Sequence, residues 1–204
     1  FCGAPWTVAT YMLQGEGGEK DRARRAAYER PADVDRLLEV LADISALHLN
    51  EQVKAGADCL QIFESWAEGL SPALFERLVI KPTRRLVERL RALGCAVPVI
   101  GFPRGAGAQT ETYALQTGVT ALGVDTQTPA SFLRGGQTSA AMALQGNLDP
   151  QLLVVGGEAL EKGVRDVVES FRNAPHIFNL GHGITPEATP ENVARLVALV
   201  KGHA

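Results

Sequence analysis

The feature that most constrains the fold is a regular alternation of short apolar runs with amphipathic stretches. Apolar runs of strand length begin near residues 1, 58, 97, 120, 140 and 176, which gives a mean spacing of 35 residues. These runs are apolar throughout, as in strands that are buried on both faces. Six strand–helix units in succession predict an α/β fold with a parallel sheet and helical crossovers. Both a doubly wound open sheet and most of a (β/α)8 barrel satisfy this order.

Proline and glycine set the predicted helix boundaries. A short helix is expected over Trp6–Gln14, and a long one runs from Pro31 to Gly56. Apolar spacing predicts that the long helix buries one face, formed by Val34, Leu37, Leu38, Leu41, Ile44 and His48. Pro82 is expected to break or kink the helix that begins at Ser71. Three further expectations concern the later part of the chain: a strand over Ala140–Leu144, a loop over Gln145–Pro150 and a helix from about Glu158 to Phe171.

Composition and charge exclude several classes of protein. The net charge of −3 gives no sign of a nucleic-acid-binding surface, and no apolar run approaches the roughly 20 residues of a membrane span. Three cysteines without a close pair argue against a disulfide framework and favour a reducing, cytoplasmic setting: Cys2, Cys59 and Cys95. No linker divides the chain, so residues 1–204 are expected to form a single domain. The start at Phe1, without Met, looks like a cut through a larger protein.

Polar residues follow each predicted strand, at the rim where parallel α/β enzymes bind their substrates. They are Tyr11, Ser65, Arg104, Asp125, Asn147, Asp149 and His182. His182 is the strongest candidate, because Gly181 and Gly183 leave little side-chain bulk beside it. The alternative is a histidine that bonds a neighbouring loop.

The other rim residues have structural alternatives as well. Ser65 lacks a G-x-S-x-G elbow, so its hydroxyl is expected to bind substrate or a helix end rather than act as a nucleophile. Tyr11 could be a packing residue, Arg104 could bind an anion, and Asp149 before Pro150 suits a helix cap. The sequence has neither H-E-x-x-H nor C-x-x-C, so a metal site is not expected.

Four motifs occur along the chain: Phe1-Cys-Gly-Ala-Pro-Trp-Thr-Val-Ala-Thr-Tyr-Met, Ala55-Gly-Ala-Asp-Cys-Leu-Gln-Ile-Phe-Glu-Ser-Trp-Ala, Leu144-Gln-Gly-Asn-Leu-Asp-Pro and Phe178-Asn-Leu-Gly-His-Gly-Ile-Thr-Pro. Together they resemble the uroporphyrinogen decarboxylase family, and the resemblance extends over the whole chain. The resemblance implies a (β/α)8 barrel, present here as about six of its eight units, and a homodimer. It also implies decarboxylation of the four acetate side chains of uroporphyrinogen III, without cofactor or metal, to give coproporphyrinogen III.

The same resemblance assigns the site residues. Tyr11, Ser65 and His182 match the family's substrate-binding tyrosine, hydroxyl residue and histidine, with Tyr11 and His182 as the catalytic candidates. Phe63 is expected to line the same pocket. The family's aspartate and arginine-rich loop belong to units upstream of the Gly-Ala-Pro-Trp motif, so the chain alone is expected to lack activity.

Two alternatives remain open at this point. A corrinoid methyltransferase of the same superfamily would bind zinc through a His-x-Cys and a later cysteine, but here Gly101-Phe-Pro-Arg and His182 occupy the corresponding positions. A non-catalytic tetrapyrrole-binding module would keep the pocket residues and lack the aspartate.

Overall fold

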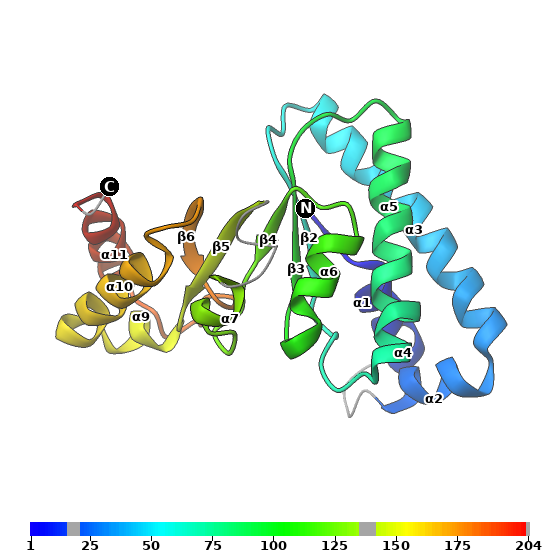
Figure 1. Ribbon diagram of the computed structural model, residues 1–204, viewed down its shortest axis with the longest axis horizontal. Coiled ribbons are helices and arrows are strands. Elements are labelled where there is room, and N and C mark those ends of the chain that lie inside the picture. The colour runs from blue at the N-terminus through cyan, green and yellow to red at the C-terminus, as the bar shows by residue number, and fades with distance from the viewer. Residues whose placement is uncertain (16–20, 135–141, 203–204) are drawn as a thin grey trace. The chain divides into compact units, whose positions relative to one another are not determined.

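The computed structural model describes residues 1–15, 21–134 and 142–202, and the chain divides into two compact units, Phe1–Thr120 and Ala121–Ala204 (Figure 1). All six predicted strands are present, and each pairs with its neighbour in the same unit in parallel. The strands are β1 (Cys2–Gly3), β2 (Leu60–Glu64), β3 (Val99–Pro103), β4 (Ala121–Gly123), β5 (Ala143–Leu148) and β6 (His176–Leu180). The α/β class predicted from the alternation is therefore confirmed.

In the first unit β2 lies between β1 and β3, and the register pairs Phe63 with both Gly3 and Phe102. Three helices pack together on these strands (Figure 1): α1 (Pro5–Gln14), α3 (Pro31–Lys54) and α5 (Lys81–Ala92). The unit also contains the 3₁₀ turn η2 (Gly107–Gln109) and α6 (Thr110–Gln116). Alternate residues of β2 are fully buried, which places Leu60, Ile62 and Glu64 on one face of the strand.

The long helix α3 has the predicted extent, and Val34 and Leu38 of its predicted apolar face are buried, but the rest of the buried face is not the predicted one. The buried positions are Val34, Leu38, Ala42, Ala46 and Leu49. Ile44 and His48 are exposed instead. The helix carries two apolar stripes, and the one with small alanines packs inward because alanine allows close approach of backbones. Periodicity alone could not distinguish the two stripes.

Pro82 does not break its helix as the sequence suggested. Ser71 caps α4 (Pro72–Phe75) by accepting a hydrogen bond from the Leu74 N–H, and a π-helical turn, η1 (Glu76–Ile80), connects α4 to α5 without interruption. Pro82 is the second residue of α5, and the preceding π turn accommodates its missing N–H. The wider π turn takes the place of the expected break.

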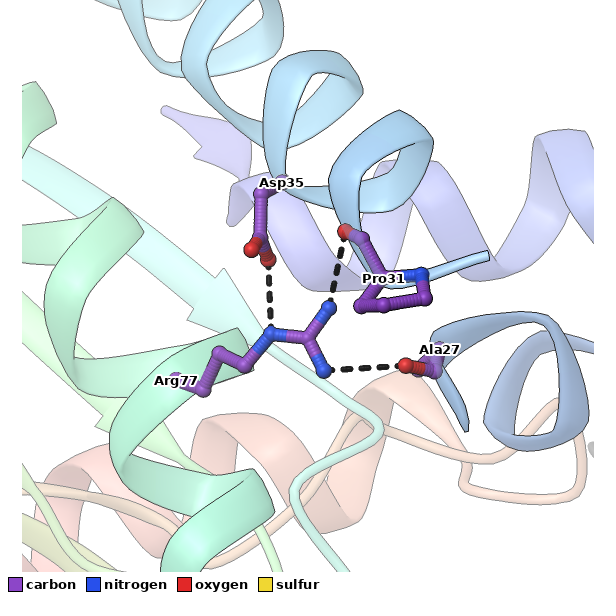
Figure 2. A network of polar contacts seen from close by, with 4 residues as sticks. All are labelled: Ala27, Pro31, Asp35 and Arg77. Carbon is purple, nitrogen blue, oxygen red and sulfur yellow. Dashed lines mark hydrogen bonds and ion pairs between the residues drawn. The ribbon is translucent and has the colours of Figure 1, made fainter. Parts of the chain in front are cut away.

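Arg77 in this π turn fastens the junction between α2 (Asp21–Glu29) and α3 (Figure 2). Its Nε donates to Asp35 Oδ1 at 2.8 Å. Its Nη1 and Nη2 donate to the carbonyls of Ala27 at 2.9 Å and Pro31 at 2.8 Å. One guanidinium thus satisfies two backbone carbonyls near a helix end and pairs with a carboxylate on the next helix.

In the second unit β5 lies between β4 and β6, and helices pack against it around a core formed by Leu148, Leu153, Leu160, Val164 and Leu196. The helices are α7 (Ala130–Arg134), α9 (Gln151–Val155), α10 (Gly157–Phe171) and α11 (Pro190–Gly202).

One expectation for this unit was wrong, since Gln145–Leu148 continues strand β5 rather than forming a loop. Helix α9 was not predicted. The expected strand residues 140 and 141 lie outside the described ranges. Within those ranges, every helix is too short or too polar to cross a membrane.

Candidate active site

Ser65 is the first residue after β2 and lies half-buried at the carboxyl end of that strand. Its backbone N–H donates to Thr7 Oγ1 at 2.8 Å. Its hydroxyl has no hydrogen-bond partner among the described residues, so the expected alternative, a bond to a helix end, is not observed. The hydroxyl is available to a ligand.

Phe63 belongs to a row of aromatic rings on one face of the first unit. It makes edge-to-face contacts with Phe1, at a centroid distance of 5.6 Å, and with Phe102, at 6.1 Å. Glu64 bonds to Thr7 of α1, so Phe63, as the preceding strand residue, faces away from that helix. The row therefore lies on the side of the strands opposite α1.

Tyr11 lies in the last turn of α1 and is 58% exposed. Its ring contacts the Trp66 ring edge-to-face, with centroids 5.8 Å apart and an interplanar angle of 70°. Trp66 follows Ser65 directly, so this contact brings Tyr11 to the carboxyl end of β2. Three of the four sequence-predicted site residues, Tyr11, Phe63 and Ser65, thus gather around one strand end of the first unit.

His182, the fourth candidate, lies two residues after β6 in the second unit and is exposed. Its Nδ1 accepts a hydrogen bond of 2.7 Å from the backbone N–H of Gly183. An accepting Nδ1 fixes the proton of the neutral imidazole on Nε2. The side chain therefore presents an N–H donor at Nε2.

The two glycines beside His182 differ in whether a larger side chain would fit at their positions. A Cβ at Gly181 would lie 2.4 Å from the backbone nitrogen of Thr126, so only glycine fits there. A Cβ at Gly183 would meet nothing within 4 Å. Close packing of two loops, rather than ligand access, therefore explains the glycine at position 181. No packing restriction requires glycine at position 183.

Most other polar residues after the strands have structural roles. Asp125 Oδ1 accepts from the N–H and hydroxyl of Thr128, and Asp149 Oδ1 accepts from the Gln151 N–H as a cap. The Asn147 amide donates to the carbonyls of Asp125 and Thr128. Nη1 of Arg104 donates to the Ser65 carbonyl at 3.4 Å.

Two residues that sequence reasoning missed are Glu64 and Thr7. Glu64 is fully buried, and its Oε1 accepts from the Thr7 hydroxyl at 2.6 Å and from the Trp66 N–H at 3.1 Å. Burial raises the pKa of the Glu64 carboxyl to about 7, although hydrogen bonds from the Thr7 hydroxyl and from the backbone of Trp66 and Thr7 act in the opposite direction. In the sequence, the sign that could have indicated Glu64 is its position as a lone acidic residue at the end of an apolar strand. Phe102 was also missed, because its contact with Phe63 depends on strand register.

The comparisons with known proteins agree with the motifs. A profile described as "Uroporphyrinogen decarboxylase (URO-D)" matches residues 1–203. A uroporphyrinogen decarboxylase of Maricaulis maris is 49% identical over 206 residues, which cover 100% of this chain and 59% of that protein. One from Phenylobacterium zucineum is 50% identical over 202 residues, 99% of this chain and 58% of that protein. The chain therefore spans less than two thirds of the length of these relatives.

Among solved structures, a methyltransferase from Methanosarcina mazei superposes with a TM-score of 0.81 at 18% sequence identity. The match covers 98% of this chain and 57% of the methyltransferase, and at this identity it bears on the fold alone. The fold is the expected one, about six of the eight strand–helix units of a (β/α)8 barrel. By motif, profile and sequence identity, the chain belongs to the uroporphyrinogen decarboxylase family.

Proposed function

We propose that this chain forms part of a uroporphyrinogen decarboxylase, which converts the four acetate side chains of uroporphyrinogen III to methyl groups. Family membership supports this proposal. The observation that carries it is the set of groups at the end of β2: the Phe63 ring, the Ser65 hydroxyl and the exposed Tyr11 phenol. These groups suit a flat, carboxylate-rich ligand, because aromatic edges contact pyrrole rings and hydroxyls donate to carboxylates.

The chemistry needs a proton and an electron sink. Each step takes one acetate carboxylate and one proton and releases CO₂, leaving a methyl group on the ring. Protonation of the pyrrole ring allows the electrons of the breaking C–C bond to flow into the ring. The exocyclic carbon then takes up a proton to become the methyl group, and the ring releases the proton that it took up, so one proton is consumed overall. An enzyme accelerates this step by supplying the proton and stabilising cationic ring character.

Within this scheme Ser65 and Phe63 bind substrate, whereas Tyr11 and His182 bind substrate and contribute to proton handling. The support for His182 is its Nε2–H, which is the proton-bearing nitrogen when Nδ1 accepts from Gly183. Tyr11 is supported by its exposure and by its contact with Trp66 beside Ser65. The reaction as proposed uses no cofactor or metal.

Three broader features belong to the same proposal. Residues 1–204 form part of one barrel domain, the complete enzyme is a homodimer, and the protein acts in the cytoplasm. The cytoplasmic setting is supported by the three cysteines, each of which is unpaired: Cys2, Cys59 and Cys95.

The test is reconstitution of the whole enzyme. Since the chain matches about 58% of the length of its relatives, the family's aspartate and arginines would come from the remaining length. We expect the 204-residue chain alone to leave uroporphyrinogen III unchanged. A fusion of the upstream part of the Maricaulis maris relative to this chain should produce coproporphyrinogen III, measured by chromatography after oxidation to the porphyrins.

The same preparations separate the alternatives. Stoichiometric zinc together with methylation of a thiol would favour a methyltransferase and overturn the proposal. Binding of tetrapyrrole without turnover by the fusion would indicate a non-catalytic binding module. Full turnover by the 204-residue chain would contradict the assignment of the essential acid to the upstream part.

A further inference from the structure

The turn that carries Ser65 and Trp66 is held by side chains at all four of its backbone polar groups. The Ser65 N–H donates to Thr7 Oγ1, and the Ser65 carbonyl accepts from Arg104. The Trp66 N–H donates to Glu64 Oε1, and the Trp66 carbonyl accepts from Trp6 Nε1 at 3.1 Å. A turn at a strand end ordinarily has water-exposed backbone groups, so this degree of fixation needs an explanation.

The two N–H groups depend on a single buried pair. The Thr7 hydroxyl donates its proton to Glu64 Oε1 at 2.6 Å and accepts the Ser65 N–H at 2.8 Å. Glu64 Oε1 receives the Trp66 N–H in addition. Both side chains are buried, with exposed fractions of 4% for Thr7 and 0% for Glu64. A hydrogen bond in such a buried site is strong, because no water competes for it.

This pair also fixes Tyr11. Thr7 and Tyr11 are four residues apart on α1 and therefore share a face of that helix. The Tyr11 ring packs on the Trp66 ring, while the Trp66 backbone is bonded to Glu64. One buried carboxylate–hydroxyl pair thus sets the position of α1 relative to the end of β2, and with it the spacing between the Tyr11 phenol and the Ser65 hydroxyl.

We infer that Glu64 and Thr7 are positioning residues, which hold Ser65 and Tyr11 at the spacing that binds the tetrapyrrole carboxylates. The inference rests on the proposed function. Glu64 itself does not touch the ligand, since it bonds to α1 on the face of β2 opposite Phe63. Its role is to keep two ligand-binding side chains, which come from different elements, in one geometry before the ligand arrives.

The experiment measures ligand binding by the 204-residue chain. The probe is uroporphyrin I, a stable octacarboxylic tetrapyrrole, and the signal is quenching of tryptophan fluorescence. Trp6 and Trp66 are the two tryptophans of the chain, and both contact the turn in question. All titrations are made well below the thermal unfolding midpoint of each variant, so that affinity is measured on folded protein.

Thr7→Val keeps the shape of the side chain and removes both hydrogen bonds. We expect it to weaken uroporphyrin binding about tenfold, the loss that corresponds to one buried hydrogen bond. Thr7→Ser retains the hydroxyl and should bind within about twofold of the parent chain. The matched control is Thr117→Val at the C-cap of α6, which removes another buried hydroxyl, bonded to the Tyr113 carbonyl at 2.7 Å. This control should lower stability without changing affinity.

Equal affinity of Thr7→Val, Thr117→Val and the parent chain would overturn the inference, even if Thr7→Val is less stable. Absence of saturable quenching in the parent chain would also overturn it, since the site would then not be preformed here. The proposed function is judged separately, by coproporphyrinogen formation in the fusion. In an active fusion, Thr7→Val should raise KM for uroporphyrinogen about tenfold, and Thr7→Ser should restore it.

Discussion

At the scale of single residues, Glu64 makes the stability of the first unit depend on pH. Its carboxyl is fully buried, and burial raises the pKa from an ordinary 4.5 to about 7. Because the folded-state pKa is the higher one, the folded protein binds the proton more tightly than the unfolded chain. The contribution of Glu64 to stability is therefore complete below the unfolded pKa and is lost as pH rises through about 7.

Glu64→Gln should remove this pH dependence. Between pH 5 and pH 8 the parent chain should lose about 2 to 3 kcal/mol of unfolding free energy relative to the variant, from a pKa difference of about 2.5 units. Urea unfolding followed by tryptophan fluorescence measures this, because Trp6 and Trp66 both belong to the first unit. If the difference in unfolding free energy between the parent chain and Glu64→Gln is constant over this pH range, the pH dependence does not come from Glu64.

Residue identity was readable from the sequence where a motif carried it. Tyr11, Phe63 and Ser65 were proposed as site residues, and they lie around the end of β2. Glu64 and Thr7 could not be found in this way, because their importance arises from a contact between residues 57 positions apart. The reason for Gly181 was hidden too, since only the folded loops bring Thr126 against it.

At the scale of helices and strands, Arg77 and Arg85 each form an ion pair with an aspartate of α3, and the two pairs can be compared. Arg77 bonds to Asp35 of α3 and to the carbonyls of Ala27 and Pro31. Arg85 bonds only to Asp43 of α3 among the described residues, and both partners are more than 40% exposed. The first arginine fastens a junction of two helices, whereas the second makes an ordinary surface pair.

Truncation should separate these roles. Arg77→Ala is expected to cost about 2 kcal/mol of unfolding free energy, because three hydrogen bonds from a charged, partly buried group are lost. Arg85→Ala should cost less than about 1 kcal/mol, as exposed ion pairs do. Urea unfolding of the two variants in parallel gives both values. Equal losses would mean that the carbonyl bonds of Arg77 add nothing to its pairing with Asp35.

Elements were predicted best where proline and glycine mark their ends. The extents of α1 and α3 were correct for this reason, since Pro5 and Pro31 occupy first turns and Gly15 and Gly56 adopt positive φ at the far ends. The π turn before Pro82 was missed, because a proline predicts only that the helix must adjust. The end of β5 was misplaced because its apolar pattern gives way to polar residues within the strand.

At the scale of the whole molecule, α3 has an apolar stripe that no described element covers. Its exposed members are Val40, Ile44 and Leu47, and the half-buried Leu37 and Leu41 adjoin them. The opposite, alanine-rich stripe of the same helix is buried. Helices with two apolar stripes occupy positions between two neighbours, as in the outer ring of a barrel. In the fusion we expect the upstream strand–helix units to cover this stripe.

The 204-residue chain alone should therefore self-associate through α3, since contiguous exposed apolar surface drives association. The double change Ile44→Lys and Leu47→Lys should shift its sedimentation coefficient toward the monomer value at concentrations where the parent associates. Glu39→Lys, an exposed change on the polar side of the same helix, is the control and should leave association unchanged. In the fusion, Ile44→Lys should leave the sedimentation coefficient unchanged if the upstream units cover the stripe and the lysine lies at the margin of that contact. If the fusion no longer folds with this change, position 44 lies at the centre of the contact. A parent chain that remains monomeric at all concentrations would refute the association.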